Sequence, residues 1–479
     1  MRMSMRRKLV SRIDITISKR EKGRKNVAST ITTNKEELFS REKLLRLILP
    51  LVVEQLLAVT VGMADMIMVS GAGEAAVSGI SLVNTISNLM IMMFSALATG
   101  GAVVSAQFLG SRDKDNACKA ANQLVLICAG FSFVIMAVSI LFNRQMLSLI
   151  YGNVEKAVMD NAVVYLYITA VSFPFLAVYN ACAGLFRSMN NSNISMKVSV
   201  VMNVLNIGGN AVFVYGCHMG VEGVGYATLI SRAVSCILML ALIRMPKYDI
   251  HVTSYLKLGW HPQMIKNILT IGVPSALENS MFQIGKLLTQ SLISSFGTAA
   301  IAANACASTV ETLADIPAIA IGLGLVTVVG QCVGAGDYRQ ARSYSKKLIG
   351  YAYFFLLIVN AVIFLMAPVI SGWYNLTELG DMYAVQLIKY HSVCCVLLWP
   401  IAFTIPQVLR AAGDVKYTLV VNVVSMWIFR IGLAYLISYM TDLGVLGVWI
   451  AMTIDWAVRA VFNVTRFHGH KWEGKAVVK

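Results

Sequence analysis

Long uncharged apolar stretches recur along the chain from Leu44 almost to its C-terminus. A helical stretch of about 20 such residues spans the hydrocarbon core of a bilayer. Of the 479 residues, 57% are hydrophobic and 13% are charged, whereas a soluble domain is roughly one-quarter charged. A water-soluble fold could not bury this much apolar surface. The sequence therefore predicts an all-α integral membrane protein.

The apolar runs, separated by polar breaks, predict twelve membrane-spanning helices. Their expected limits are 44–70, 77–108, 120–142, 162–186, 194–216, 222–243, 264–295, 299–332, 345–367, 384–409, 417–440 and 444–465. Residues 1–43 are rich in Lys and Arg and have no apolar run long enough for a signal-peptide core. They predict a solvated basic tail, and binding of this tail to anionic lipid is the alternative interpretation.

Lysine and arginine divide the predicted connections into two sides. Connections 71–76, 216–221, 296–298 and 441–443 carry neither residue, and 143–161 carries only Arg144 and Lys156. The alternate connections carry Arg112, Lys114, Lys119, Arg187, Lys197, Arg244, Lys247, Lys257, Lys266, Arg339, Arg342, Lys346, Lys347, Arg410 and Lys416. Cytoplasmic connections are enriched in these residues. The bias predicts a multi-pass cell-membrane protein with both termini in the cytoplasm.

The chain repeats itself at an offset of 224 residues. In this register Pro50 and Glu54 align with Pro274 and Glu278, and Gln-x-x-Gly-x-x-Asp recurs at 107–113 and 331–337. Six helices, an even number, separate equivalent points, so the halves enter the membrane in the same direction. Such parallel repeats around a central cavity are typical of alternating-access transporters.

The repeat also predicts the domain limits. We expect a basic cytoplasmic tail at 1–43, an N-lobe of helices 1–6 at 44–243 and a cytoplasmic linker at 244–263. A C-lobe of helices 7–12 at 264–465 and a second basic tail at 466–479 complete the chain.

Polar residues in the N-lobe predict a site for a coupling ion. Asp65 in the first helix, Asn206 and Asn210 in the fifth and Thr228 in the sixth fall at similar depth. A carboxylate with amide and hydroxyl oxygens suits either a transported proton or a hard cation such as Na⁺. Interhelical hydrogen bonding without transport is the alternative. Glu54 lies about 20° from Asp65 around the same helix, so one polar stripe should face the interior.

The C-lobe carries further ionisable residues that lipid makes expensive to bury. Six acidic, basic and amide side chains are candidates for the cavity or the substrate site: Glu54, Glu278, Gln283, Lys286, Glu311 and Asp315. We expect Lys286 to be compensated by Glu278, Glu311 or Asp315. Arg232, Arg430 and Arg459 are expected to be structural or to reach toward the membrane surface.

Several motifs are missing. Gly285-Lys286 is followed by Leu287, so no phosphate-binding loop of the G-x-x-x-x-G-K-[ST] type is present. The nine cysteines include no C-x-x-C pair, which indicates neither a disulfide framework nor a zinc site. His468 and His470 could bind a metal, but two histidines alone do not predict a metal site. No nucleophile and base motif appears, so we expect no enzyme activity, no cofactor and no metal other than possible Na⁺ at Asp65.

Short motifs in order resemble the multidrug and toxic compound extrusion (MATE) family over residues 40–465. In the first half they are Leu49-Pro50, Ala64-Asp65-Met66-Ile67-Met68, Gln107-Phe108-Leu109-Gly110 and Asn206-Ile207-Gly208-Gly209-Asn210. In the second half they are Ile271-Gly272-Val273-Pro274, Gly297-Thr298-Ala299-Ala300-Ile301-Ala302-Ala303-Asn304 and Gln331-Cys332-Val333-Gly334.

This resemblance implies two six-helix lobes around a V-shaped cavity. It also implies antiport of small organic, often cationic, compounds against H⁺ or Na⁺, with Asp65, Asn206, Asn210 and Thr228 at the N-lobe cation site. Asn210 departs from members that have Asp there, which leaves the ion open. We expect a monomer in contact with lipid, without nucleic acid. The rival interpretations are a flippase of a lipid-linked precursor, which should line its cavity with Arg or Lys, and an intramembrane enzyme.

Overall fold

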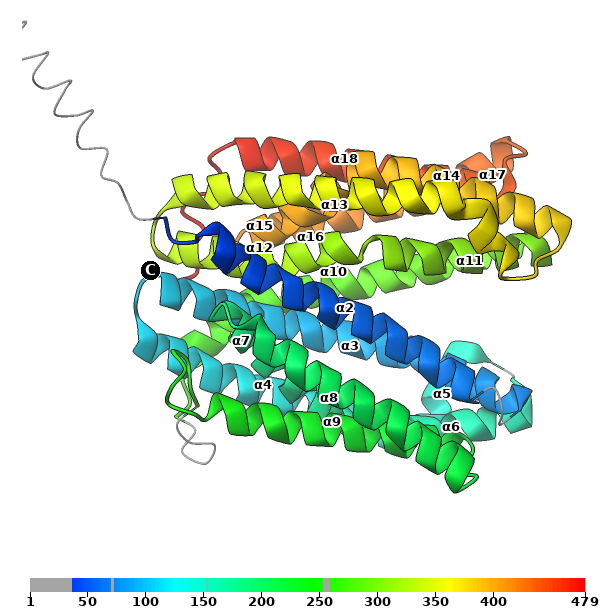
Figure 1. Ribbon diagram of the computed structural model, residues 1–479, viewed down its shortest axis with the longest axis horizontal. Coiled ribbons are helices and arrows are strands. Elements are labelled where there is room, and N and C mark those ends of the chain that lie inside the picture. Colours follow the sequence, from blue (N-terminus) through cyan, green and yellow to red (C-terminus); the bar gives the residue numbers. More distant parts are fainter. Residues whose placement is uncertain (1–36, 70–72, 153, 253–258, 479) are drawn as a thin grey trace, which may run out of the picture. The chain divides into compact units, whose positions relative to one another are not determined.

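The computed structural model describes residues 37–69, 73–152, 154–252 and 259–478. The chain divides into the unit Met1–Ser40 and the compact unit Arg41–Lys479, and only the second is described below. Most of the predicted basic tail lies outside the described residues. The described part of the second unit is built of helices, without a strand (Figure 1).

The helices of the first half, which we call the N-lobe, form the lower part of Figure 1, with α2 running along its upper edge. They are α2 (Arg41–Val69), α3 (Glu74–Gly110), α4 (Lys114–Leu141), α5 (Asn143–Tyr151), α6 (Lys156–Val171), α7 (Phe173–Ser188), α8 (Ser192–Asn210), the π-helical turn η2 (Ala211–Gly216) and α9 (Val221–Ile243).

The second half, the C-lobe, forms the upper part of the same view. Its helices are α10 (Pro262–Ser294), α11 (Thr298–Ala314), α12 (Ile316–Gly334), α13 (Tyr338–Gly372), α14 (Glu378–Trp399), η3 (Pro400–Thr404), α15 (Ile405–Ala411), α16 (Val415–Ser425), η4 (Met426–Gly432), α17 (Leu433–Met440) and α18 (Gly444–His468).

The predicted all-α membrane architecture is confirmed, but the count of twelve spans is not. In the described residues, ten helical segments are long and apolar enough to cross a membrane, or eleven when the bent pair α6 and α7 counts as one. The polar helix α10 has 33 residues but is not among them. Its row of charged and amide side chains lowers its hydropathy below that of its neighbours.

Two predicted straight helices are broken in the structure. The segment predicted at 162–186 bends by 45° between α6 and α7, and the segment predicted at 299–332 divides at Asp315. Proline is the second residue of the second piece in both cases, Pro174 and Pro317, where its missing N–H interrupts the ladder of backbone hydrogen bonds. The short helix α5 was not predicted, because it lies in a connection between spans.

Large apolar side chains remain exposed on the outer helices. Leu141 of α4 is 71% exposed and Leu365 of α13 is 78% exposed, and both belong to long apolar helices. A soluble monomer seldom leaves apolar patches of this extent in water. These surfaces therefore fit contact with lipid.

The two lobes meet closely at one end of the unit, which we call the Gly110 end. A Cβ atom at Gly110 would collide with the carbonyl of Gln331, and one at Gly334 would collide with the carbonyl of Gln107. The repeated Gln-x-x-Gly motif thus lets α3 and α12 approach backbone to backbone. The Gln107 side chain donates to the Ala411 carbonyl at 2.8 Å, and the Gln331 side chain donates to the Ser188 carbonyl at 2.6 Å.

Candidate functional site

A cavity of about 780 Å³ lies between the lobes. The N-lobe contributes side chains of α2 and α3, including Asn88, Met92 and Ser95, and most of the remaining wall comes from the C-lobe. An adjoining cavity of about 380 Å³ shares Gln283, Lys286, Glu311 and Arg430 with the first. The charged groups of the C-lobe therefore line both spaces.

The four predicted N-lobe residues form one chain of hydrogen bonds. The Asn210 amide donates to Asp65 Oδ1 at 2.5 Å and to Asn206 Oδ1 at 3.5 Å. The Asn206 amide donates to Thr228 Oγ1 at 3.3 Å. Helices α2, α8 and α9 thus place a carboxylate, two amides and a hydroxyl in contact.

Local sequence positions these side chains. Asn206 and Asn210 are four residues apart on α8, so they lie on one helical face, and both are buried. The π-helical turn η2 begins directly after Asn210, and such turns interrupt regular helices often at functional sites. Asn210 Oδ1 is buried without a hydrogen-bond partner among the described residues, which leaves one oxygen available to a proton donor or cation.

Asp65 is not neutralised by a direct ion pair. It is partly exposed, and no Lys or Arg nitrogen lies within 4.0 Å of it in the described part of the chain. Arg232 of α9 interacts with it electrostatically but donates its hydrogen bond to Ser172 Oγ at 2.8 Å, at the break between α6 and α7. The carboxylate is therefore free to bind a small cation.

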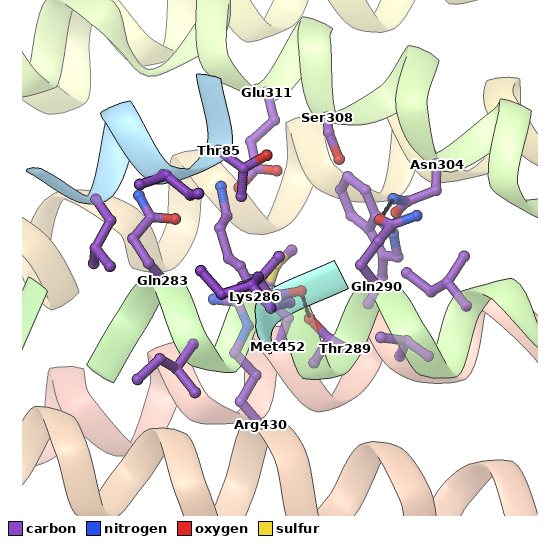
Figure 2. A pocket seen from close by; sticks show the side chains of 18 of the residues that line it. Thr85, Gln283, Lys286, Thr289, Gln290, Asn304, Ser308, Glu311, Arg430 and Met452 are labelled. Atoms are coloured by element: carbon purple, nitrogen blue, oxygen red, sulfur yellow. Dashed lines mark hydrogen bonds between the residues drawn. The ribbon is translucent and has the colours of Figure 1, made fainter. Parts of the chain in front are cut away.

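The C-lobe wall carries charge of both signs. Lys286 extends from α10 toward Glu311, as Figure 2 shows, with Gln283 and Arg430 around it. Lys286 makes no ion pair within 4.0 Å among the described residues, although it interacts electrostatically with Asp315. The predicted compensation of Lys286 is thus a longer-range electrostatic interaction rather than a direct ion pair. Glu278 is not the partner of Lys286.

Glu278 is instead paired with an arginine that sequence reasoning placed in a connection. Arg410 lies in α15, is buried, and donates through Nη2 to Glu278 Oε1 at 2.5 Å. The Asn422 amide donates to the same oxygen at 2.5 Å. The signal for this pair was available in the repeat, because Glu54 and Arg187 occupy nearly equivalent positions in the first half.

Glu54 does not line the cavity, which corrects its assignment as a substrate candidate. It is 8% exposed and accepts from Arg187 Nη1 at 3.3 Å and from Ser195 Oγ at 2.8 Å. Its helix face meets α7 and α8 inside the N-lobe rather than the opposite lobe. Arg187, like Arg410, pairs with a glutamate of its own lobe. It lies in the helix α7 and not in a connection.

Comparison with known proteins identifies the chain. The MatE family model matches residues 50–212 and 274–436, which are two copies at the offset of 224 residues that relates the halves. The chain belongs to the MatE family.

Two relatives of this MatE protein share about a quarter of its residues. The uncharacterized transporter YisQ of Bacillus subtilis is 27% identical over 89% of this chain and 94% of its own length. The probable multidrug resistance protein NorM of Thermotoga maritima is 26% identical over 91% of this chain and 94% of its own length.

The fold matches solved MATE structures. An outward-facing multidrug resistance MATE transporter of the MOP superfamily has a TM-score of 0.84 and 21% identity. That match covers 90% of this chain and 96% of the other. The predicted family and the transporter fold with two related halves are confirmed.

Among the MatE protein's predicted cavity residues, five line the large cavity: Glu278, Gln283, Lys286, Glu311 and Asp315. Gln283 donates to Met92 Sδ at 2.8 Å and so joins α10 to α3 across the cavity. Sequence reasoning missed the arginines of this wall. Arg430 and Arg459, which were expected to be structural, line it as well as Arg410.

Three cationic side chains of the cavity wall lie around the aromatic ring of Phe282. Arg430 lies 5.2 Å, Lys286 5.8 Å and Arg459 5.9 Å from the ring centroid, distances at which cations are attracted to an aromatic face. Arg459 also pairs with Asp455 at 2.8 Å, whereas Arg430 has no direct ion pair within the described ranges. A substrate in this cavity would meet unpaired Lys286 and Arg430 together with Glu311 and Asp315.

Proposed function

We propose that this MatE protein is a secondary active multidrug exporter, which antiports small organic cations against H⁺ or Na⁺ by alternating access. The similarity to probable multidrug resistance proteins supports the substrate class. We further propose that the monomer is the working unit and that it needs no cofactor and catalyses no reaction.

The observation that carries this proposal is the network around Asp65. A carboxylate without a direct ion pair, beside amide and hydroxyl oxygens, can alternate between binding and releasing a small cation. Asn210 Oδ1, buried without a partner in the described structure, offers one further oxygen. A fixed ion pair at Asp65 would remove this exchange.

The direction of export follows from the proposed orientation. Basic residues concentrate at the Gly110 end, so we propose that this end faces the cytoplasm and that the protein lies in the cell membrane. The close contact of α3 with α12 at this end supports a conformation that opens to the outside. Glu311 would attract an organic cation, and apolar wall residues such as Phe282 would contact its rings.

Proteoliposomes test the function directly. We expect proteoliposomes to take up a fluorescent organic cation against its concentration gradient when an outward-directed proton or sodium gradient is imposed, because an antiporter moves the ion out as the cation enters. We expect no such uptake without an ion gradient. The ion that drives uptake decides between H⁺ and Na⁺. Movement without either gradient, or no movement with both, would refute ion-coupled export.

Labelling tests the orientation separately. Cysteines introduced at Ala75 and Ala299 should react with an impermeant maleimide from outside the cell, and cysteines at Asp113 and Asp337 should react only after permeabilisation. Asp113 caps the N-terminus of α4 and Asp337 caps that of α13, at equivalent places in the repeat. The opposite pattern within either pair would reverse the proposed topology.

One observation favours the flippase interpretation as a second candidate. The cavity wall carries Lys286, Arg410, Arg430 and Arg459, and two of them have no direct ion pair among the described residues, which suits a pyrophosphate. Translocation of a fluorescent lipid-linked pyrophosphate in the same proteoliposomes, without uptake of organic cations, would favour this candidate.

A further inference from the structure

Three side chains with metal-ligating atoms meet inside the C-lobe, beside the large cavity. Asp315 lies at the break between α11 and α12, and His391 and Cys395 are four residues apart on α14. One ligand atom from each lies within 4.8 Å of the others. All three residues are buried, with exposed fractions of 7%, 2% and 0%. This is the single such group in the described parts of the chain.

One ring atom in this cluster lacks a partner. His391 Nε2 is buried without a hydrogen-bond partner among the described residues, which is an unfavourable state for a polar atom. The ring is held edge-on by Trp449 and Trp456, with centroids 5.8 Å away in both cases. The surrounding aromatic side chains thus fix the imidazole but do not satisfy it.

We propose that Asp315, His391 and Cys395 form a zinc-binding site whose fourth position opens to the cavity. Sulfur, nitrogen and carboxylate oxygen are the ligands that Zn²⁺ takes, and three protein ligands with one open position is a common arrangement for zinc. Mg²⁺ and Ca²⁺ prefer oxygen alone. Histidine and cysteine at i and i+4 place both ligands on one face of α14.

The geometry needs a small adjustment to receive the ion. Cys395 Sγ lies 3.3 Å from Asp315 Oδ1, close to the roughly 3.3–3.7 Å between ligands of a tetrahedral zinc with bonds of about 2.0–2.3 Å. The widest separation in the group is at most 4.8 Å, so the ligand atoms would need to approach one another by at most about 1.5 Å to hold the ion.

Charge also balances in the occupied site. The Cys395 thiol donates its hydrogen to Asp315, and binding of Zn²⁺ replaces that proton, which leaves through the cavity that Asp315 lines. One thiolate, one carboxylate and a neutral imidazole then bring the net charge of the site to zero. A neutral site is far less costly than an isolated ion in a membrane interior.

Asn360 of α13 is a positioning residue for this site. Its amide donates to Cys395 Sγ at 3.7 Å and to the Leu356 carbonyl at 3.0 Å, which orients the sulfur from behind. Such outer partners tune metal affinity. The absence of a C-x-x-C pair, from which we predicted no zinc site, is therefore not decisive, because the third ligand lies far away in sequence.

Direct zinc binding tests the proposal in the purified full-length protein. After treatment with a chelator, the protein is titrated with ZnCl₂ against a chromophoric competitor, and the bound metal is counted by elemental analysis. We expect one zinc per chain, and higher thermal stability with zinc because the ion binds the folded state. Cobalt in place of zinc should show a thiolate charge-transfer absorption band.

The variants Cys395→Ser and Cys394→Ser form a matched pair. Cys394 is adjacent on α14 but is not part of the cluster, so its variant should bind zinc as the parent does. Cys395→Ser should weaken binding by at least ~100-fold, since outer-shell changes alone cost about 10–100-fold. His391→Gln gives an independent second test should the serine variant not fold.

Three outcomes would overturn the proposal. They are a parent protein that binds less than one-tenth of an equivalent of zinc, equal binding by the two cysteine variants, or a cobalt complex without the thiolate band. Since none of these readouts depends on transport, the site can fail while the exporter function stands, and the reverse also holds.

Discussion

The two lobes keep the same packing contacts but carry different chemistry. Each pairs a glutamate of its first helix with an arginine that directly follows its fourth predicted span, Glu54 with Arg187 and Glu278 with Arg410. In contrast, the N-lobe network holds a single carboxylate among amides and a hydroxyl, whereas the C-lobe wall holds four cations and three acids. The two halves therefore share the glutamate and arginine pair, whereas the polar and charged groups of their candidate sites differ.

The Gly110 end shows the same division in detail. Gln107 and Gln331 each cross to the other lobe, but their side-chain carbonyls have different partners. Gln331 Oε1 accepts from Asn190 at 3.3 Å. Gln107 Oε1 accepts from the backbone N–H groups of Val477 and Val478 at 3.0 and 3.3 Å. The C-terminal segment thus occupies the place that Asn190 takes on the other side.

The largest expected effect concerns Asp65. Asp65→Asn should leave expression and folding intact but reduce gradient-driven export to the level of empty vesicles, because an amide cannot exchange a cation. The measurement is dye uptake by proteoliposomes under an imposed gradient. Asp160→Asn is the control, since Asp160 is exposed and paired with Arg144 at 3.5 Å, so uptake should stay within about twofold.

The same assay tests whether the coupling ion binds in the N-lobe or in the C-lobe. If Asp65→Asn exports normally and Asp315→Asn does not, the coupling ion binds in the C-lobe and the N-lobe network is structural.

The second prediction compares the two glutamate and arginine pairs. Glu278→Gln should lower the free energy of unfolding by about 3–5 kcal/mol, because it leaves Arg410 buried beside the other cations of the cavity. Glu54→Gln should cost less, since the Arg187–Glu54 pair is longer than the Arg410–Glu278 pair, at 3.3 Å against 2.5 Å, and slightly more exposed. Thermal and denaturant unfolding in detergent measures both losses.

A double variant sharpens the second prediction. Adding Arg410→Met to Glu278→Gln should recover part of the loss, because the uncompensated charge is removed. Equal losses for both glutamates would show that the two pairs contribute alike. No recovery in the double variant would show that the uncompensated charge of Arg410 does not cause the loss.

The third prediction concerns the glycines of the repeated motif. Gly110→Ala and Gly334→Ala should each destabilise the described conformation by about 1–3 kcal/mol, because the added Cβ meets backbone of the opposite lobe. Gly130→Ala and Gly350→Ala are controls in α4 and α13, where nothing lies within 4 Å. Those variants should be neutral or more stable by up to about 1 kcal/mol. Similar melting temperatures for all four would contradict the close contact.

The smallest effect is expected at the C-terminal segment. Partial burial alone would raise the pKa of Glu473, but hydrogen bonds from His470 and Arg342 outweigh it and hold the pKa below 4.5. The stabilisation is thus present above the unfolded pKa and disappears as pH falls through the lower, folded value. Glu473→Gln should weaken attachment by less than about 1 kcal/mol at pH 7, as expected for a partly exposed pair.

Hydrogen exchange at Val477 and Val478 measures this attachment. Faster exchange in Glu473→Gln at pH 7, with no difference from the parent once Glu473 is protonated, would agree with the pair. A difference that persists in acid would assign the effect to packing of Trp472 instead, since that side chain is fully buried.

The sequence determined whatever depends on one helix or on the repeat. The length of the apolar runs predicted membrane-spanning helices, and the recurrence of Gln-x-x-Gly at 107 and 331 predicted two related halves. The spacing of Asn206 and Asn210 placed both amides on one face. Periodicity is sufficient for these features, because it decides which side chains share a helix face.

Only the tertiary structure decided what each face meets. Glu54 and Glu278 are equivalent in the repeat, yet Glu278 lines the cavity and Glu54 does not. Arg410 was placed in a connection but closes an ion pair across 132 residues of sequence. Asp315 reaches Cys395 across 80 residues, at a break that only helix packing fixes. Contacts between helices depend on their crossing angles and bends, and a single sequence does not specify these in advance.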